Sequence, residues 1–116
     1  MKKTCIFLLH GSRRPRKGEI ESIISKVNLP SYFEKHIAYL ELQEPAFSDC
    51  LSACEDSHEV HILPLFVLEG RHVREDIPEI TEELEQKAPE KKFIVHPHIG
   101  EWDLFSQMLG EKVASL

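Results

Sequence analysis

Four short apolar runs alternate along this chain with segments of helical periodicity. The runs predicted as strands are residues 3–9, 36–42, 59–68 and 92–97. Most of them are continuously apolar, which is typical of strands that are buried on both faces, as parallel strands are. Strands that alternate with helices favour a parallel sheet with right-handed crossovers. We therefore expect an α/β fold, with a four-stranded parallel sheet and alternating helices, in one domain that spans residues 1–116.

The segments between the strands predict four helices, because their apolar residues recur at helical spacing. They cover residues 19–27, about 45–54, from Val73 or Ile77 to Lys87, and from about Asp103 onward. The last helix is expected to face the core with Leu104, Met108, Leu109 and Val113. Within the third strand, Pro64 predicts a bulge or a local loss of pairing, since proline cannot donate to the ladder.

Composition narrows the classes of partner. The net charge of −6 argues against a general nucleic-acid binder. No apolar run approaches the roughly 20 residues that span a bilayer, and the faintly signal-like start is interpreted as the first strand. The three cysteines, Cys5, Cys50 and Cys54, form no disulfide framework and are expected to be buried free thiols. These features predict a cytoplasmic protein with neither nucleic acid nor membrane as a partner.

Histidines follow two of the predicted strands. The first strand ends in His10-Gly-Ser-Arg-Arg14, and the third runs into Gly70-Arg71-His72. Because the carboxyl ends of parallel strands share one edge of a sheet, where ligands bind, we expect His10 and His72 to lie on one rim. Two imidazoles alone hold a divalent ion weakly, because a stable structural metal site has about four ligands. The pair therefore predicts a metal ion that is passed on, or a proton-transfer role, rather than a permanent cofactor.

Arginines accompany both histidines. Arg13, Arg14 and Arg71 are expected at the same rim, where guanidinium groups would recognise carboxylates or phosphates. A basic cluster on an acidic chain predicts a specific anionic ligand. The remaining histidines are weaker candidates: His36, His58 and His61 are expected on the surface, whereas His96 and His98 bracket Pro97 at a strand end and are given a secondary role.

Three motifs resemble the sirohydrochlorin chelatase family of the class II chelatase superfamily. They are Leu8-Leu-His-Gly-Ser-Arg-Arg-Pro15, Ala38-Tyr-Leu-Glu-Leu-Gln-Glu-Pro45 and Leu63-Pro-Leu-Phe-Val-Leu-Glu-Gly-Arg-His-Val-Arg-Glu-Asp-Ile-Pro78. They occur in the family's order, and the match is to its short, single-module form, the half-size cobalt or nickel chelatases. The resemblance implies a lyase that inserts a divalent metal into sirohydrochlorin, a tetrapyrrole with eight carboxylates, in cobalamin or a related porphyrin-type pathway.

The resemblance also assigns roles to individual residues. It implies that His10 and His72 bind the incoming metal and that His10 accepts pyrrole N–H protons. Arg13 and Arg14 would pair with the substrate's carboxylates. The metal, Co²⁺, Ni²⁺ or possibly Fe²⁺, is then a substrate, and no tightly bound cofactor is expected. The resemblance implies further substrate contacts from the following residues: Glu44, Val67, Leu68, Glu69, Gly70, Arg71 and His72.

The same resemblance implies a homodimer, because one four-stranded module is too small to enclose a macrocycle. Two other functions use the same residues. A metal or tetrapyrrole carrier would bind both substrates without turnover. A histidine phosphatase would use His10 as nucleophile and Arg13 and Arg14 on the phosphate. Phosphatases of that kind place an arginine directly before the histidine, where this chain has Leu9.

Overall fold

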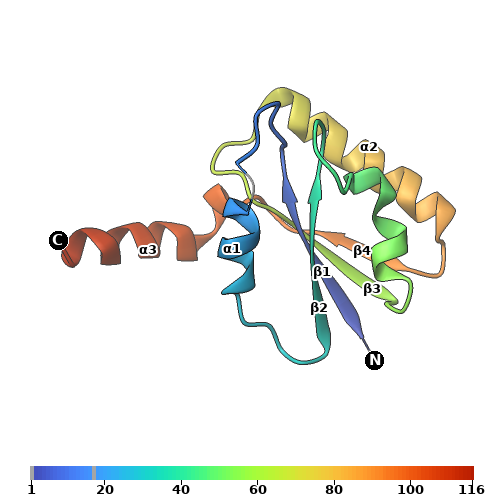
Figure 1. Cartoon of the computed structure of the whole chain (residues 1–116), viewed down its shortest axis with the longest axis horizontal. Coiled ribbons are helices and arrows are strands. Elements are labelled where there is room, and N and C mark those ends of the chain that lie inside the picture. The colour runs from blue at the N-terminus through green and yellow to red at the C-terminus, as the bar shows by residue number, and fades with distance from the viewer. Residues whose placement is uncertain (1, 17) are drawn as a thin grey trace.

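A computed structural model describes residues 2–16 and 18–116. Four strands form one parallel sheet in the order β2-β1-β3-β4 (Figure 1). The predicted α/β class is confirmed. Among the described residues, no helix is both long and apolar enough to cross a membrane. The strands are β1 (Lys3–Leu9), β2 (Phe33–Tyr39), β3 (Glu59–Pro64) and β4 (Lys92–Val95).

Both faces of the sheet are apolar, so both require cover. On one face, Ile6 and Leu8 of β1 pack against the 3₁₀ helix η1 (Phe47–Cys54) and the helix α2 (Arg71–Lys87). On the other face, Cys5 and Phe7 pack against α1 (Glu19–Ser25). Because residues alternate between faces along a strand, a continuously apolar β1 is what such a two-sided core requires.

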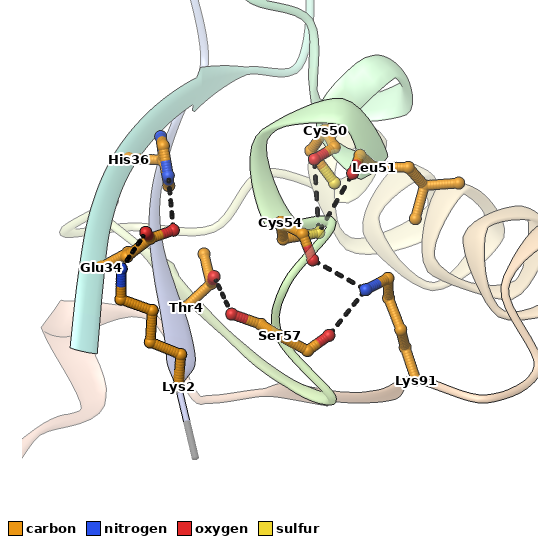
Figure 2. A network of polar contacts seen from close by, with 9 residues as sticks. All are labelled: Lys2, Thr4, Glu34, His36, Cys50, Leu51, Cys54, Ser57 and Lys91. Atoms are coloured by element: carbon orange, nitrogen blue, oxygen red, sulfur yellow. Dashed lines mark hydrogen bonds and ion pairs between the residues drawn. The ribbon is translucent and has the colours of Figure 1, made fainter. Parts of the chain in front are cut away.

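Three polar side chains on the η1 side of the core form hydrogen bonds: Thr4, Ser57 and Lys91 (Figure 2). The hydroxyls of Thr4 and Ser57 are 2.6 Å apart and fully buried. The Lys91 ammonium donates to the carbonyls of Cys54 and Ser57 at 2.7 and 2.6 Å. These bonds tie the end of η1 to the sheet and to the loop before β4. The prediction that the cysteines are buried free thiols is confirmed for all three.

Several predicted boundaries differ from the structure. The segment predicted as a helix at 45–54 is the 3₁₀ helix η1. Helix α2 begins at Arg71, ahead of Val73 and Ile77, and it contains Pro78. A proline inside a helix forfeits one backbone hydrogen bond, which made Ile77 a plausible start, but here tertiary packing of Val73 and Ile77 outweighs that loss. Strand β3 ends at Pro64, where the ladder was expected to weaken.

The last helix does not face the core of its own chain, so that prediction is wrong. Helix α3 (Asp103–Ala114) follows the short 3₁₀ helix η2 (Ile99–Glu101) and projects away from the sheet (Figure 1). Its apolar stripe is exposed: Leu104 by 70%, Met108 by 53%, Leu109 by 51% and Val113 by 67%. An apolar stripe predicts a face that needs a partner, but it does not say whether the partner belongs to the same chain.

A groove of about 470 Å³ lies on the sheet face beside α1. Its floor contains a histidine pair: His61 Nδ1 lies 2.8 Å from His96 Nε2, and His61 Nε2 lies 2.7 Å from a Glu59 carboxylate oxygen. His61 is therefore partly buried, and its prediction as a surface residue is wrong, because its strand position turns it toward this face. The groove is otherwise mainly apolar, lined also by Cys5, Leu29, Pro30, Phe33, Leu63, Pro97 and Trp102.

The contacts of Glu59 with His61 and Lys3 predict that the stability of the fold depends on pH. A hydrogen bond from His61, and then one from Lys3, lower the pKa of Glu59 from 4.5 to about 2. A lowered carboxyl pKa stabilises the fold above the unfolded value, and this contribution is lost as pH falls from about 4.5 to about 2. The measurement is the free energy of unfolding in denaturant at a series of pH values. As pH falls through that window, we expect this free energy to decrease less for Glu59→Gln than for the wild type. Glu79→Gln, at an exposed position of α2, is the matched control, and an identical profile for Glu59→Gln and wild type would contradict the assignment.

Candidate functional site

His10 stands directly after β1, at the carboxyl edge of the sheet. Its side chain is about half exposed, with Nδ1 3.2 Å from the Gly11 carbonyl and Nε2 3.4 Å from Glu41 Oε1. In the tautomer that donates Nδ1–H to Gly11, Nε2 carries the lone pair. This nitrogen can then bind a metal ion or accept a proton, and the Glu41 carboxylate would stabilise the imidazolium that results.

Contacts between two loops fix the position of His10. The amide of Glu41 donates to the His10 carbonyl at 3.1 Å. Gly11 has a φ of +103°, and a Cβ at this position would lie 1.8 Å from the Glu41 carbonyl oxygen. Only glycine satisfies both conditions. The loop after β1 and the loop after β2 therefore lie in direct contact, and this contact fixes the backbone at His10.

An open cavity of about 1030 Å³ lies beside His10 at this edge of the sheet. It brings together three residues predicted from the sequence, His10, Arg14 and Glu44, and adds Gln43, whose side-chain oxygen accepts from the Ser12 amide at 2.8 Å. The cavity can therefore offer a nitrogen lone pair, a guanidinium and a carboxylate to one ligand. Among the described residues, the lining is Leu9–Ser12, Arg14–Arg16, Gly18–Glu21, Tyr39, Leu42–Glu44, Leu65 and Phe66.

His72 lies in the first turn of α2 rather than in a turn at a strand end, because the six residues 65–70 separate β3 from the helix. Its side chain is 77% exposed, and Nε2 lies 3.3 Å from Asp76 Oδ2, one helical turn further on. Arg71 beside it is almost fully exposed and lies 3.6 Å from Glu75. The loop after β1 and the start of α2 lie at the same end of the sheet, as Figure 1 shows.

The predicted residues thus fall into two groups at one edge. His10, Arg14 and Glu44 line the cavity, whereas Arg13 and the segment from Val67 to His72 are not part of the cavity lining among the described residues. Val67 and Leu68 are exposed, by 51% and 86%. Over residues 2–16 and 18–116, no group of three or more histidines, cysteines or carboxylates is placed to hold a metal ion.

Sequence analysis missed two carboxylates beside the histidines. Asp76 stands four residues after His72, and this spacing places both side chains on one helix face. Glu41 had no such signal, because its contact with His10 joins two loops that are 31 residues apart in the sequence. A carboxylate that contacts an imidazole helps to fix the orientation of the ring.

The fold and this edge together define a parallel α/β module with imidazoles after its first strand and at the start of the helix after its third. The family model CbiX matches residues 4–116, and the chain belongs to the CbiX family.

Relatives within and around this family differ in length. The chain is 28% identical over 107 residues to a sirohydrochlorin ferrochelatase of Bacillus subtilis (strain 168), covering 86% of this chain and 40% of that protein. It is 27% identical over 101 residues to a sirohydrochlorin cobaltochelatase of Priestia megaterium, covering 84% of this chain and 33% of that protein. The chain therefore spans less than half the length of these two curated relatives.

One solved structure matches over nearly its whole length. It is described as a cobalamin (vitamin B12) biosynthesis CbiX protein from Marinobacter aquaeolei VT8. The two structures agree with a TM-score of 0.77 at 25% identity, and the match covers 97% of this chain and 95% of that one. The two chains are therefore of similar length and share this fold.

Proposed function

We propose that the protein is a sirohydrochlorin chelatase, which inserts a divalent metal ion into the macrocycle and releases two protons. The observation that carries the proposal is His10, with an available Nε2, a carboxylate at 3.4 Å and a position at the mouth of a 1030 Å³ cavity. The family membership and the activities of the relatives described above support the same reaction.

In this mechanism His10 Nε2 accepts a pyrrole proton as the metal enters, and Glu41 stabilises the charge that develops. His72 would present the metal ion, since a single exposed imidazole binds an ion weakly enough to release it. Arg14 within the cavity, Arg13 beside it in the sequence and Arg71 at the start of α2 would pair with the acetate and propionate groups of the substrate. Glu44 and the segment from Val67 to His72 are proposed as further substrate contacts.

We propose that residues 1–116 form one chelatase domain that acts as a homodimer in the cytoplasm. Two unpartnered surfaces support the dimer: the exposed apolar stripe of α3 and the mainly apolar groove on the sheet face. The helix that follows β4 would normally cover that face, and here it projects away from it. If α3 of each copy covers the groove of the other, both surfaces are buried by one symmetric exchange.

The identity of the metal is tested by a competition assay. Purified protein is mixed with sirohydrochlorin and equal concentrations of Co²⁺, Ni²⁺ and Fe²⁺, and the products are separated by their absorbance spectra. We expect insertion well above the rate of the protein-free reaction, and the preferred ion then identifies the pathway. A rate no higher than the uncatalysed one, with both substrates bound, would instead identify a carrier.

A further inference from the structure

The middle of the loop that carries the chain from β3 to His72 has little packing of its own. This loop covers residues 65–70, and its central residues Val67 and Leu68 are exposed. Such a loop is mobile unless another segment fixes its backbone. Its first residue is fixed, because the Leu65 amide donates to the Leu8 carbonyl at 2.8 Å. Further along, Phe66 packs against the core, and the remaining backbone and side-chain contacts come from the first turns of α2 and from the turn that follows β4.

Gly100 of that turn touches the loop backbone directly. Its amide donates to the Phe66 carbonyl at 3.2 Å. A Cβ on Gly100 would lie 1.7 Å from the Val67 carbonyl oxygen and 2.8 Å from the carbonyl carbon. No side chain fits in that space, so the two backbones can lie this close only with glycine at position 100. The turn therefore sets the path of the loop at its midpoint.

A charged contact fixes the end of the loop. The carboxylate of Glu69 lies between Arg74 of α2, with Nε at 3.4 Å, and His98, with Nδ1 at 3.7 Å. The side chains of Glu69 and His98 are only 21% and 12% exposed, so this pair is better shielded from water than an ordinary surface contact. Glu69 is three residues before His72, and its carboxylate joins the loop, the first turns of α2 and the turn after β4.

We propose that His98 and Gly100 are positioning residues for His72. Both residues contact the loop 65–70 from the turn that follows β4. By fixing this loop they set the position of the first turn of α2, and with it the position of the His72 imidazole at the sheet edge. This inference rests on the proposed function, because it gives His72 a metal ion to bind.

The test uses three variants of the full-length protein, His98→Gln, Glu69→Gln and Gly100→Ala, with His58→Gln as the matched control at an exposed histidine. Two quantities are measured for each variant: the Kd for Co²⁺ alone, and the KM for Co²⁺ with kcat in the insertion assay. Loss of a residue that orients a metal ligand costs about 10- to 100-fold in affinity. We expect a rise of about 10-fold in Kd and KM for the three variants, with kcat changed by less than threefold, and wild-type values for His58→Gln.

Hydrogen exchange distinguishes positioning from a general structural role. Amides of residues 65–72 should exchange faster in His98→Gln, while those of β1 and β3 keep their wild-type protection. If Gly100→Ala fails to fold, His98→Gln and Glu69→Gln still decide the question, since they change only side-chain contacts. Unchanged Co²⁺ affinity in those two variants, or loss of protection throughout the sheet, would overturn the inference. Wild-type protein that binds Co²⁺ without inserting it would refute the proposed function alone.

Discussion

Replacing His10 by alanine is expected to abolish metal insertion while the fold persists. The variant removes the proton acceptor, and a positioned general base contributes about 10²- to 10⁴-fold to a rate. Its side chain is about half exposed, so its loss leaves no cavity in the core. The measurement is the initial rate of insertion into sirohydrochlorin, followed by absorbance, together with the thermal unfolding midpoint. A wild-type rate in His10→Ala would refute the assignment of the reaction to this residue.

His72→Ala and Glu41→Gln divide the mechanism further. We expect His72→Ala to lose insertion at low Co²⁺ and to recover part of it at high Co²⁺, because it removes a ligand and leaves the base. Glu41→Gln keeps the size of the side chain but cannot stabilise an imidazolium at His10. Its rate should therefore fall without a change in the Co²⁺ concentration at half-saturation. His36→Ala, which changes a histidine on β2 away from this edge, is the control.

Local sequence patterns were enough to predict the sheet and the position of His10. The run at 3–9 is apolar on both faces beyond its first residues, and this pattern favours a buried parallel strand without any knowledge of its neighbours. His10 follows from the end of the first run. The contact between Gly11 and Glu41 could not be predicted, because it depends on how two loops meet at the sheet edge. The start of α2 was misjudged because Pro78 penalises a helix locally, whereas burial of Val73 and Ile77 favours it.

The apolar stripe of α3 shows the limit of such patterns in another way. The stripe itself was predicted correctly, through Leu104, Met108, Leu109 and Val113. Its orientation was not, because periodicity describes a helix face and says nothing about which chain covers it. The same holds for the groove beside α1, whose apolar lining comes from segments far apart in the sequence. Only the fold reveals that the chain has both an uncovered helix face and an uncovered sheet face.

Replacing Leu109 by glutamate is expected to convert the protein into a monomer. In an exchanged dimer each copy buries Leu109, so the variant loses two leucine burials of about 2 kcal/mol each. The dissociation constant should rise by about a thousandfold, since 1.4 kcal/mol corresponds to a factor of ten. The measurement is the mass in solution by light scattering across a concentration series: about twice the chain mass of 13.4 kDa for wild type, and the chain mass for the variant.

Gln107→Glu is the matched control, because it adds the same charge on the polar side of α3. It should remain a dimer. The monomeric variant should also lose insertion, since a single module cannot enclose the macrocycle, yet it should still bind Co²⁺ at His72. That pair of results would separate the need for a second copy from damage to the metal site. Wild-type protein that runs at 13.4 kDa at all concentrations and still inserts the metal would show instead that one copy is sufficient, and that α3 has another partner.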